Sequence, residues 1–286
     1  MKVLILGAGG MLGHMMLREL GASRDLTVIG TVRAPAPALT GFGRVALCTG
    51  VDALDTGGLR ALMAEVRPDV VLNCVGLVKQ HMAACDPLPA LQVNAVLPHQ
   101  LGRLCQQVGA RLIHFSTDCV FSGARGTYRE SDPSDPVDLY GRTKLLGEVA
   151  NDPAVLTLRV SFVGPELGTT HGLLAWFLAQ HQAVRGFRHA IFSGFTSLEL
   201  ARIVRDRLLA RPDLHGVYHL SADPISKLDF LSLAGRIYGH AIPIEPCDQP
   251  VIDRSLDSTR LREALGYRPP SWQDMLTDLH TLERYD

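Results

Sequence analysis

Two side chains near the middle of the chain have types and a spacing that suit acid–base chemistry. Tyr140 and Lys144 are four residues apart, so in a helix they lie on the same face. A free phenol titrates near pH ~10 and is a poor acid at neutral pH, but a neighbouring ammonium favours the phenolate. Lowering the pKa of Tyr140 by about three units requires roughly 4 kcal/mol of such stabilisation. On its own this spacing is common and also fits an exposed helical pair.

Thr117 supplies a further hydroxyl at the end of a run that reads as a buried strand, residues 111–116. A phenol can give its proton to a carbonyl oxygen while a threonine hydroxyl hydrogen-bonds to the same oxygen, as hydride addition to a ketone requires. We therefore interpret Thr117, Tyr140 and Lys144 as a catalytic set.

A glycine motif near the N-terminus indicates where the hydride comes from. Gly7, Gly10 and Gly13 follow the apolar run at residues 3–6 and open a helical segment, with Met11 and Leu12 before the third glycine. In this position the glycines allow a tight turn, close approach of a pyrophosphate and close packing of helix on strand. The helix N-terminus favours an anion. We predict that these five residues bind a dinucleotide; a glycine-rich turn without a ligand is the alternative.

The end of the second predicted strand indicates which dinucleotide is bound. Many NAD sites carry an acid there for the ribose 2′-hydroxyl, but residues 31–33 read Thr-Val-Arg. Arg33 suits the 2′-phosphate of NADPH, and a solvated loop arginine is the alternative. We predict NADPH as the cofactor, with NADH possible. Tyr140 and Lys144 are expected to contact it, and the oxidised nicotinamide further favours the Tyr140 phenolate.

These residues need a scaffold that brings distant segments together, and the hydrophobic pattern predicts one. Short apolar runs that read as strands cover residues 3–6, 26–32, 45–47, 70–75, 111–116 and 155–160. Segments with helical spacing cover residues 11–20, 59–66, 97–108 and 140–149. Strands that alternate with helices over short connections predict an α/β fold, a Rossmann-type doubly wound parallel sheet.

After residue 160 the alternation loosens, with one helix expected near residues 198–209 and one strand near 217–220. We assign residues 1–160 to an NAD(P)-binding Rossmann domain, to which the chain returns near 190–222. Residues 161–286 mainly form a smaller, irregular C-terminal substrate-binding lobe. Because ligands of open α/β sheets bind beyond the carboxyl ends of the strands, we expect this lobe to close over that edge.

The assembled pattern resembles the extended short-chain dehydrogenase/reductases and, within them, the dTDP-4-dehydrorhamnose reductases. The segments that carry the resemblance are FSTDCVFSG at 115–123, YRESDP at 128–133 and LYGRTKLLGE at 139–148. RPDVVLN at 67–73, VNA at 93–95, LRVS at 158–161 and DRSLD at 253–257 are weaker matches. The resemblance implies NADPH-dependent reduction of the C4 ketone of a 4-keto-6-deoxy nucleotide sugar.

The resemblance also implies roles for residues that spacing alone does not single out. Asn73, Val75 and Gly76 are implied to line the cofactor ribose, and Asp52 to face the adenine. Asp118 is implied to touch the sugar. These assignments extend the cofactor and substrate sites beyond the glycine motif and the catalytic set.

Three further residues are candidates for substrate binding. Cys119 stands where the family usually has tyrosine, so a substrate contact is changed. Gln80 follows the fourth predicted strand and points to where substrate should lie, although a solvated loop fits equally well. Arg254 is a candidate for the nucleotide diphosphate, with a structural ion pair as the alternative.

Composition excludes several classes of protein. The 286 residues carry 28 basic and 29 acidic side chains, a formal net charge of −1, so no global field favours nucleic acid or anionic lipid. No apolar stretch approaches the ~20 residues of a membrane span. Six scattered cysteines without a CxxC pair indicate free thiols in a reducing cytoplasm. Eleven histidines show no ligand spacing, so we expect no metal site.

Two other functions stay open from the sequence. An epimerase or dehydratase of the same superfamily retains NAD and suits an acid, rather than Arg33, after the second strand. A non-catalytic regulatory subunit would keep the fold without needing Thr117, Tyr140 and Lys144 together. The expected partner is a nucleotide-sugar substrate, without nucleic acid or membrane, and a homodimer is possible.

Overall fold

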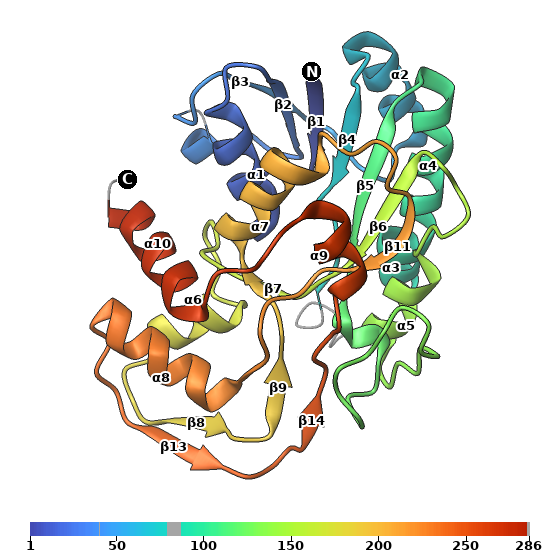
Figure 1. The fold of residues 1–286 in the computed structure, drawn as a ribbon. Helices are drawn as coiled ribbons and strands as arrows, with labels where there is room; N and C mark the ends of the chain where they lie inside the picture. The colour runs from blue at the N-terminus through green and yellow to red at the C-terminus, as the bar shows by residue number, and fades with distance from the viewer. Residues whose placement is uncertain (40, 79–86, 285–286) are drawn as a thin grey trace.

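A parallel sheet forms the centre of the protein (Figure 1). The computed structural model describes residues 1–39, 41–78 and 87–284, and within them this sheet has seven strands in the order β3-β2-β1-β4-β5-β6-β11. Every neighbouring pair is parallel. The predicted α/β class with a Rossmann-type parallel sheet is confirmed.

The sheet strands are β1 (Lys2–Leu6), β2 (Thr27–Val32), β3 (Val45–Thr49), β4 (Val70–Asn73), β5 (Arg111–Ser116), β6 (Val155–Arg159) and β11 (Gly216–His219). The helices of this part are α1 (Met11–Gly21), α2 (Thr56–Val66), α3 (Leu88–Ala90), α4 (Leu97–Val108), α5 (Leu139–Leu146) and α7 (Ser197–Ile203). A π-helical segment, η3 (Leu91–Val96), joins α3 to α4, and a second, η5 (Val204–Leu208), continues α7. Short 3-10 turns are η1 (Pro37–Leu39) and η4 (Asp118–Val120).

Apolar residues on both faces of each central strand explain the unbroken hydrophobic runs of the sequence. In β1, Val3 and Ile5 pack into the core shared with α1 and α7. Leu4 and Leu6 point to the opposite face and pack with α2 and α4. A sheet covered by helices on both faces buries every strand residue, so alternation of apolar and polar residues is lost.

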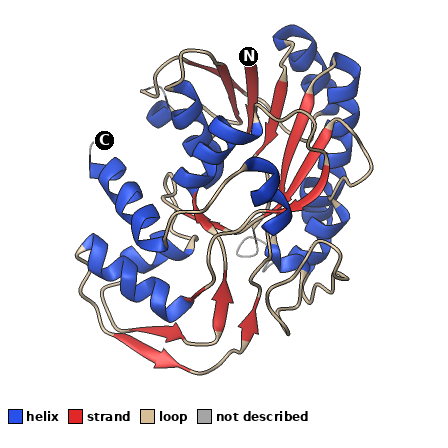
Figure 2. Ribbon diagram, viewed as in Figure 1, coloured by secondary structure: helices blue, strands red, loops and turns tan. Residues whose placement is uncertain are grey.

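The C-terminal lobe lies beyond the carboxyl ends of the sheet strands, as Figures 1 and 2 show. Its helices are α6 (Leu173–Leu178), α8 (Lys227–Tyr238), α9 (Thr259–Leu265) and α10 (Trp272–Arg284). Its short strands are β7 (Phe162–Val163), β8 (Val184–Phe187), β9 (Ala190–Phe192), β10 (Phe195–Thr196), β12 (Ile225–Ser226), β13 (Ile244–Cys247) and β14 (Ile252–Asp253). Phe192, Phe230 and Trp272 meet edge to face at the centre of the lobe.

Two elements from the second half of the chain pack against the sheet and helices formed by the first half. Helix α7 packs against α1, and β11 pairs with β6 at the edge of the sheet. Both fall in the stretch 190–222, where the sequence analysis places a return of the chain to the Rossmann domain. The division at residue 160 stays our proposal for the domain boundary.

Strand β4 and helix α5 end two or more residues earlier than the hydrophobic pattern predicts. Strand β4 stops at Asn73 rather than residue 75, because the Asn73 side chain accepts a hydrogen bond from the Val75 N–H and turns the chain. Helix α5 stops at Leu146 rather than residue 149. A Cβ at Gly147 would overlap the carbonyl oxygen of Asn94, so only glycine allows this approach of α5 to η3.

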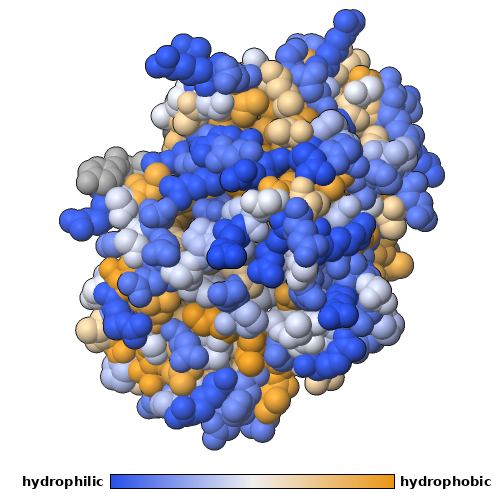
Figure 3. Space-filling model, in the orientation of Figure 1, coloured by the Kyte–Doolittle hydropathy of each residue, from blue (hydrophilic) through white to orange (hydrophobic). Residues whose placement is uncertain are grey.

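The surface is largely polar. The face in Figure 3 is covered mainly by hydrophilic residues, with apolar ones in separate patches. In the part of the chain that the structure describes, every helix is too short or too polar to cross a bilayer.

Candidate functional site

The glycine turn between β1 and α1 is shaped for a ligand that approaches the backbone closely. Gly7 has a φ of +79°, which side chains rarely allow, and the Gly10 N–H donates to its carbonyl oxygen at 3.1 Å. A Cβ at Gly13 would overlap that same oxygen. Thr31, which the sequence analysis did not single out, anchors the turn because its Oγ1 accepts from the Gly7 N–H at 3.3 Å.

The N-terminus of α1 fits the pyrophosphate of a dinucleotide. Gly10 caps this 11-residue helix, and no side chain accepts its first N–H groups. These donors and the helix dipole favour an anion at this position. Leu12 is 4% exposed and belongs to the core, so only its backbone faces the turn, whereas Met11 is half-buried and contacts the loop at Gly172.

Arg33 and Asp52 follow two neighbouring strands at the same edge of the sheet. Arg33 is exposed directly after β2. Asp52 comes after β3, where the Val51 N–H donates to the Val32 carbonyl and draws this segment towards the end of β2. The Asp52 carboxylate accepts from the Leu54 N–H at 2.9 Å. Both lie at the edge where an adenine ribose is held in sheets of this type.

The segment after β4 lies against the glycine turn. A Cβ at Gly7 would come within 3.0 Å of Val75 Cγ2, so the two segments are adjacent. Asn73 is 1% exposed and its amide is committed within the protein, donating to His114 Nδ1 at 3.1 Å. Val75 and Gly76, rather than the Asn73 side chain, therefore present the surface available to a ribose.

Asn94 organises the same region. Its amide accepts from the Leu77 N–H and donates to the Leu77 carbonyl, both at 2.9 Å. It also donates to Thr143 Oγ1 on α5 at 3.3 Å. Residues 93–95 matched a family pattern in the sequence, but no local signal showed that Asn94 links the loop after β4 to the helix that carries Tyr140.

The fold brings Thr117 and Tyr140 together. The phenol is hydrogen-bonded to the Thr117 side chain, although the two residues are 23 positions apart. A Cβ at Gly141 would overlap the carbonyl oxygen of Cys119, so glycine lets α5 approach the turn after β5. Asp138 caps α5 by accepting from the Gly141 N–H at 2.8 Å. The N-terminus of α5 is thereby fixed next to the end of β5.

Lys144 is buried one turn along α5 and donates from Nζ to the Phe115 carbonyl at 2.5 Å. Burial lowers the pKa of Lys144 to about 8, and the charge of Glu148 opposes this change. Burial raises the pKa of Tyr140, and Cys119, Asp118 and Asp138 raise it further. The prediction that the ammonium lowers the phenol's pKa was wrong for the residues of this chain, because burial disfavours the phenolate, Asp118 and Asp138 add to this effect, and Lys144 is directed to a backbone carbonyl.

The predicted substrate residues Asp118, Cys119 and Arg254 lie together beside Tyr140. Burial raises the pKa of Asp118, while Arg254 and a hydrogen bond from Cys119 favour its charged form. Burial and Asp118 raise the pKa of the Cys119 thiol to about 12, so this thiol is protonated at neutral pH. Arg254 donates from Nε to the Phe121 carbonyl at 2.9 Å. Of the predicted substrate residues, Gln80 lies outside the described residues.

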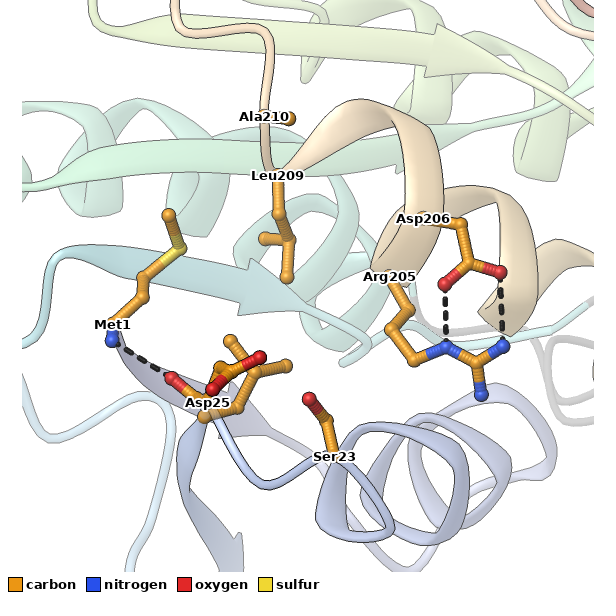
Figure 4. A pocket seen from close by; sticks show the side chains of 8 residues that line it. Met1, Ser23, Asp25, Arg205, Asp206, Leu209 and Ala210 are labelled. Carbon is orange, nitrogen blue, oxygen red and sulfur yellow. Dashed lines mark hydrogen bonds and ion pairs between the residues drawn. The ribbon is translucent and has the colours of Figure 1, made fainter.

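A cavity at the opposite edge of the sheet is separate from this site (Figure 4). It measures about 560 Å³ and is lined by Met1, Ser23, Asp25, Leu26, Arg205, Asp206, Leu209 and Ala210. The Arg205 guanidinium is paired with Asp206 at 2.7 and 2.9 Å. None of the predicted site residues that the structure describes lines this cavity. Among the described residues, no group of three or more His, Cys, Asp or Glu side chains is placed to hold a metal ion.

One known family matches nearly the whole chain. The model of the RmlD substrate binding domain matches residues 1–284. The chain belongs to the RmlD family. The resemblance carried by residues 115–148 is thereby confirmed, and the RmlD match extends it through the C-terminal lobe.

Three proteins illustrate what this chain is similar to. A dTDP-4-dehydrorhamnose reductase of Burkholderia thailandensis is 33% identical over 304 residues, which cover 96% of each chain. The solved structure of a dTDP-4-dehydrorhamnose reductase of Bacillus anthracis in complex with NADP has a TM-score of 0.79 at 20% identity, covering 98% of this chain and 99% of that one. The mouse methionine adenosyltransferase 2 subunit beta is 33% identical over 162 residues, 56% of this chain and 46% of that protein.

Proposed function

We propose that this RmlD-family protein is an oxidoreductase that uses NADPH to reduce the C4 ketone of a 4-keto-6-deoxy nucleotide sugar. The observation that carries the proposal is the Tyr140–Thr117 hydrogen bond, held beside the buried Lys144 and at the same sheet edge as the glycine turn. The similarity over full length to a dTDP-4-dehydrorhamnose reductase supports this reaction class.

The chain's own residues act on the ketone oxygen. The Tyr140 hydroxyl donates its proton to that oxygen, and the Thr117 hydroxyl hydrogen-bonds to it as negative charge develops. A raised pKa keeps Tyr140 protonated and ready to donate across the neutral range. The nicotinamide, when bound, supplies the hydride. Gly7, Gly10 and Gly13 would hold its pyrophosphate, and Val75 and Gly76 its ribose.

Arg33 is proposed to select NADPH by pairing with the 2′-phosphate. We expect Arg33→Ala to raise the KM for NADPH about 10- to 100-fold, the cost of one or two charge-assisted hydrogen bonds. The KM for NADH should stay nearly unchanged, because NADH lacks that phosphate. Initial rates with each cofactor measure the ratio. An equal rise of KM for both cofactors would show that Arg33 does not bind the 2′-phosphate. Arg44→Ala serves as the arginine control.

Arg254 is proposed to contact the nucleotide diphosphate, next to the sugar site at Asp118 and Cys119. We expect Arg254→Ala to raise the KM for the nucleotide sugar by about 10-fold or more and to leave the affinity for NADPH unchanged. The bond to the Phe121 carbonyl uses only Nε, so the variant also loses a structural contact. Arg254→Gln retains an amide donor there, and if it restores full substrate affinity, Arg254 is structural.

Oxidation of NADPH with a panel of dTDP-, UDP- and GDP-linked 4-keto sugars tests the proposed reaction. Turnover of one of them supports it. A response to none of them favours the second candidate, a regulatory subunit, for which the similarity to the mouse methionine adenosyltransferase subunit is the supporting observation. Isomerisation of a sugar without net oxidation of NADPH would instead indicate an epimerase.

A homodimer is the oligomeric state that we propose. Val96 on η3 and Leu146 on α5 are 48% and 61% exposed, and they lie beside one shallow cavity on this surface. Sedimentation of the wild type and of Leu146→Lys would show whether this surface joins two copies. A monomer at all concentrations would contradict the proposal.

A further inference from the structure

A buried ionic network joins the strand ends beneath the catalytic set. Arg159, the last residue of β6, donates from Nε to Glu148 Oε1 at 2.8 Å and from Nη2 to Glu148 Oε2 at 2.7 Å. The two side chains are only 7% and 6% exposed. A buried ion pair carries a desolvation cost that often cancels its attraction, so stability alone is a weak reason for its position. The proposed mechanism gives this pair no role.

Glu148 is bonded to the residue before Thr117 and acts through its charge on Lys144. Its Oε1 accepts from Ser116 Oγ at 2.7 Å, and Ser116 is the residue before Thr117. Lys144 lies four residues before Glu148, and the carboxylate charge favours its ammonium form. One carboxylate therefore acts on the strand end that carries Thr117 and on the lysine beside Tyr140.

Arg159 extends the network to the segment that leads from β5 to α5. Its Nη2 donates to Ser134 Oγ at 3.2 Å, and its guanidinium lies 5.1 Å from the centre of the Phe121 ring. Its Nη1 lies 3.3 Å from His219 Nε2 on β11, and His219 Nδ1 lies 3.0 Å from the Tyr128 carbonyl. A neutral His219 with its proton on Nδ1 satisfies both bonds. The pair thus holds four strand and helix ends in one arrangement.

The other titratable groups around Lys144 do not replace Glu148 as the source of negative charge beside its ammonium. Burial and Lys144 itself lower the pKa of His114 on β5 well below its usual value, so this ring is neutral. Tyr140 on α5 stays protonated because burial raises its pKa. Asp118 after β5 interacts with Arg254, whereas the charge that raises the pKa of Lys144 is that of Glu148. His99 on α4 acts on His114 and carries no negative charge.

We propose that Glu148 is a positioning residue of this site, the counter-charge that keeps Lys144 protonated and, with Arg159, fixes the strand end bearing Thr117. The catalytic role of Glu148 rests on the proposed function. Its effect on the charge of Lys144 does not, because the ionisation of Lys144 can be followed without turnover. The pair also explains why α5 ends at Leu146: the chain must turn inward for Glu148 to reach Arg159 and Ser116.

The test follows the titration of Lys144 by NMR of protein carrying isotope-labelled lysine. The chain has four lysines, Lys2, Lys79, Lys144 and Lys227, and Lys144→Arg identifies the relevant signal. We expect Glu148→Gln to lower the pKa of Lys144 by roughly one unit, because a nearby opposite charge is lost. The ammonium is then lost at lower pH, so the alkaline limb of the kcat/KM profile moves to lower pH by the same amount.

Two variants separate this role from a structural one. Glu148→Gln combined with Arg159→Met removes both charges, and we expect a smaller downward shift than in Glu148→Gln, where the Arg159 charge remains unpaired. If Glu148 had only a structural role, the Lys144 titration of the double variant would differ more from the wild type than that of Glu148→Gln. Glu199→Gln is the matched control: Glu199 is a buried carboxylate on α7 bonded to Tyr267, and we expect no shift of the Lys144 titration.

The outcomes are distinguishable from those of the proposed function. If Lys144 titrates as in the wild type in folded Glu148→Gln, the proposal is overturned even when the enzyme turns over. If the wild type reduces none of the sugars but the Lys144 titration shifts, the reaction is wrong and the role of Glu148 stands. If Glu148→Gln does not fold, the double variant decides, and an unchanged titration in it overturns the proposal.

Discussion

Replacement of Tyr140 by phenylalanine is expected to lower kcat/KM for the 4-keto sugar by about 10³-fold, within the range that a positioned proton donor supplies. Phenylalanine keeps the ring and removes only the hydroxyl that is bonded to Thr117. The affinity for NADPH should change little, because the glycine turn is untouched. Initial rates of NADPH oxidation and a fluorescence titration of the cofactor measure the two quantities separately.

Tyr267→Phe is the matched control for this substitution. Tyr267 is also a partly buried tyrosine, and its hydroxyl donates to Glu199 at 2.7 Å, away from the catalytic set. We expect this variant to lose about 1 kcal/mol of stability, the value of one hydrogen bond, and to retain its rate. A Tyr140→Phe enzyme that keeps the wild-type kcat/KM would rule out the proton transfer that we assign to Tyr140.

The second large effect is expected at Gly13. An alanine Cβ there would overlap the carbonyl oxygen of Gly7 and come within 2.9 Å of Ala8 Cα. Both are backbone atoms of the turn, so helix α1 or the turn must move. We expect Gly13→Ala to weaken NADPH binding at least 100-fold, and overpacking of this kind to lower the free energy of unfolding by about 1–3 kcal/mol.

Gly9→Ala tests whether the position rather than the loss of a glycine causes this effect. The nearest atom to a Cβ at Gly9 is Val32 Cγ1 at 3.9 Å, an ordinary contact. We expect a much smaller loss of NADPH affinity and nearly unchanged thermal unfolding. Calorimetric titration and melting curves check both variants. Unchanged NADPH affinity in Gly13→Ala would show that the cofactor does not depend on this turn.

Local patterns predicted the features that depend on chain neighbours. The apolar run before Gly7 and the helical spacing after it located the cofactor turn, because a strand, a tight turn and a helix leave their marks within a few residues. Tyr140 and Lys144 were found in the same way, since a helix places residues four apart on one face. The Rossmann-type parallel sheet followed from the repetition of such segments and is confirmed, and the structure gives it seven strands among the described residues.

Other features of the site depend on residues that are far apart in the chain. The bonds of Asn94 to Leu77 and Thr143, and the committed amide of Asn73, have no local signature. The direction of the pKa change at Tyr140 was predicted wrongly, because burial and nearby acidic groups act together and neither is visible in a four-residue spacing.

The sequence by itself thus determined the fold class, the glycine turn and the residue types of the catalytic set, because each is written in local periodicity and spacing. Only the tertiary structure decided how these residues are charged and held. Arg159 and His219 are 60 positions apart, and Arg159 ends β6 while Glu148 lies in the loop after α5, yet they meet beneath Thr117 and Lys144. Burial and hydrogen-bond partners arise from the packing of distant segments, and that packing sets the electrostatics of the site.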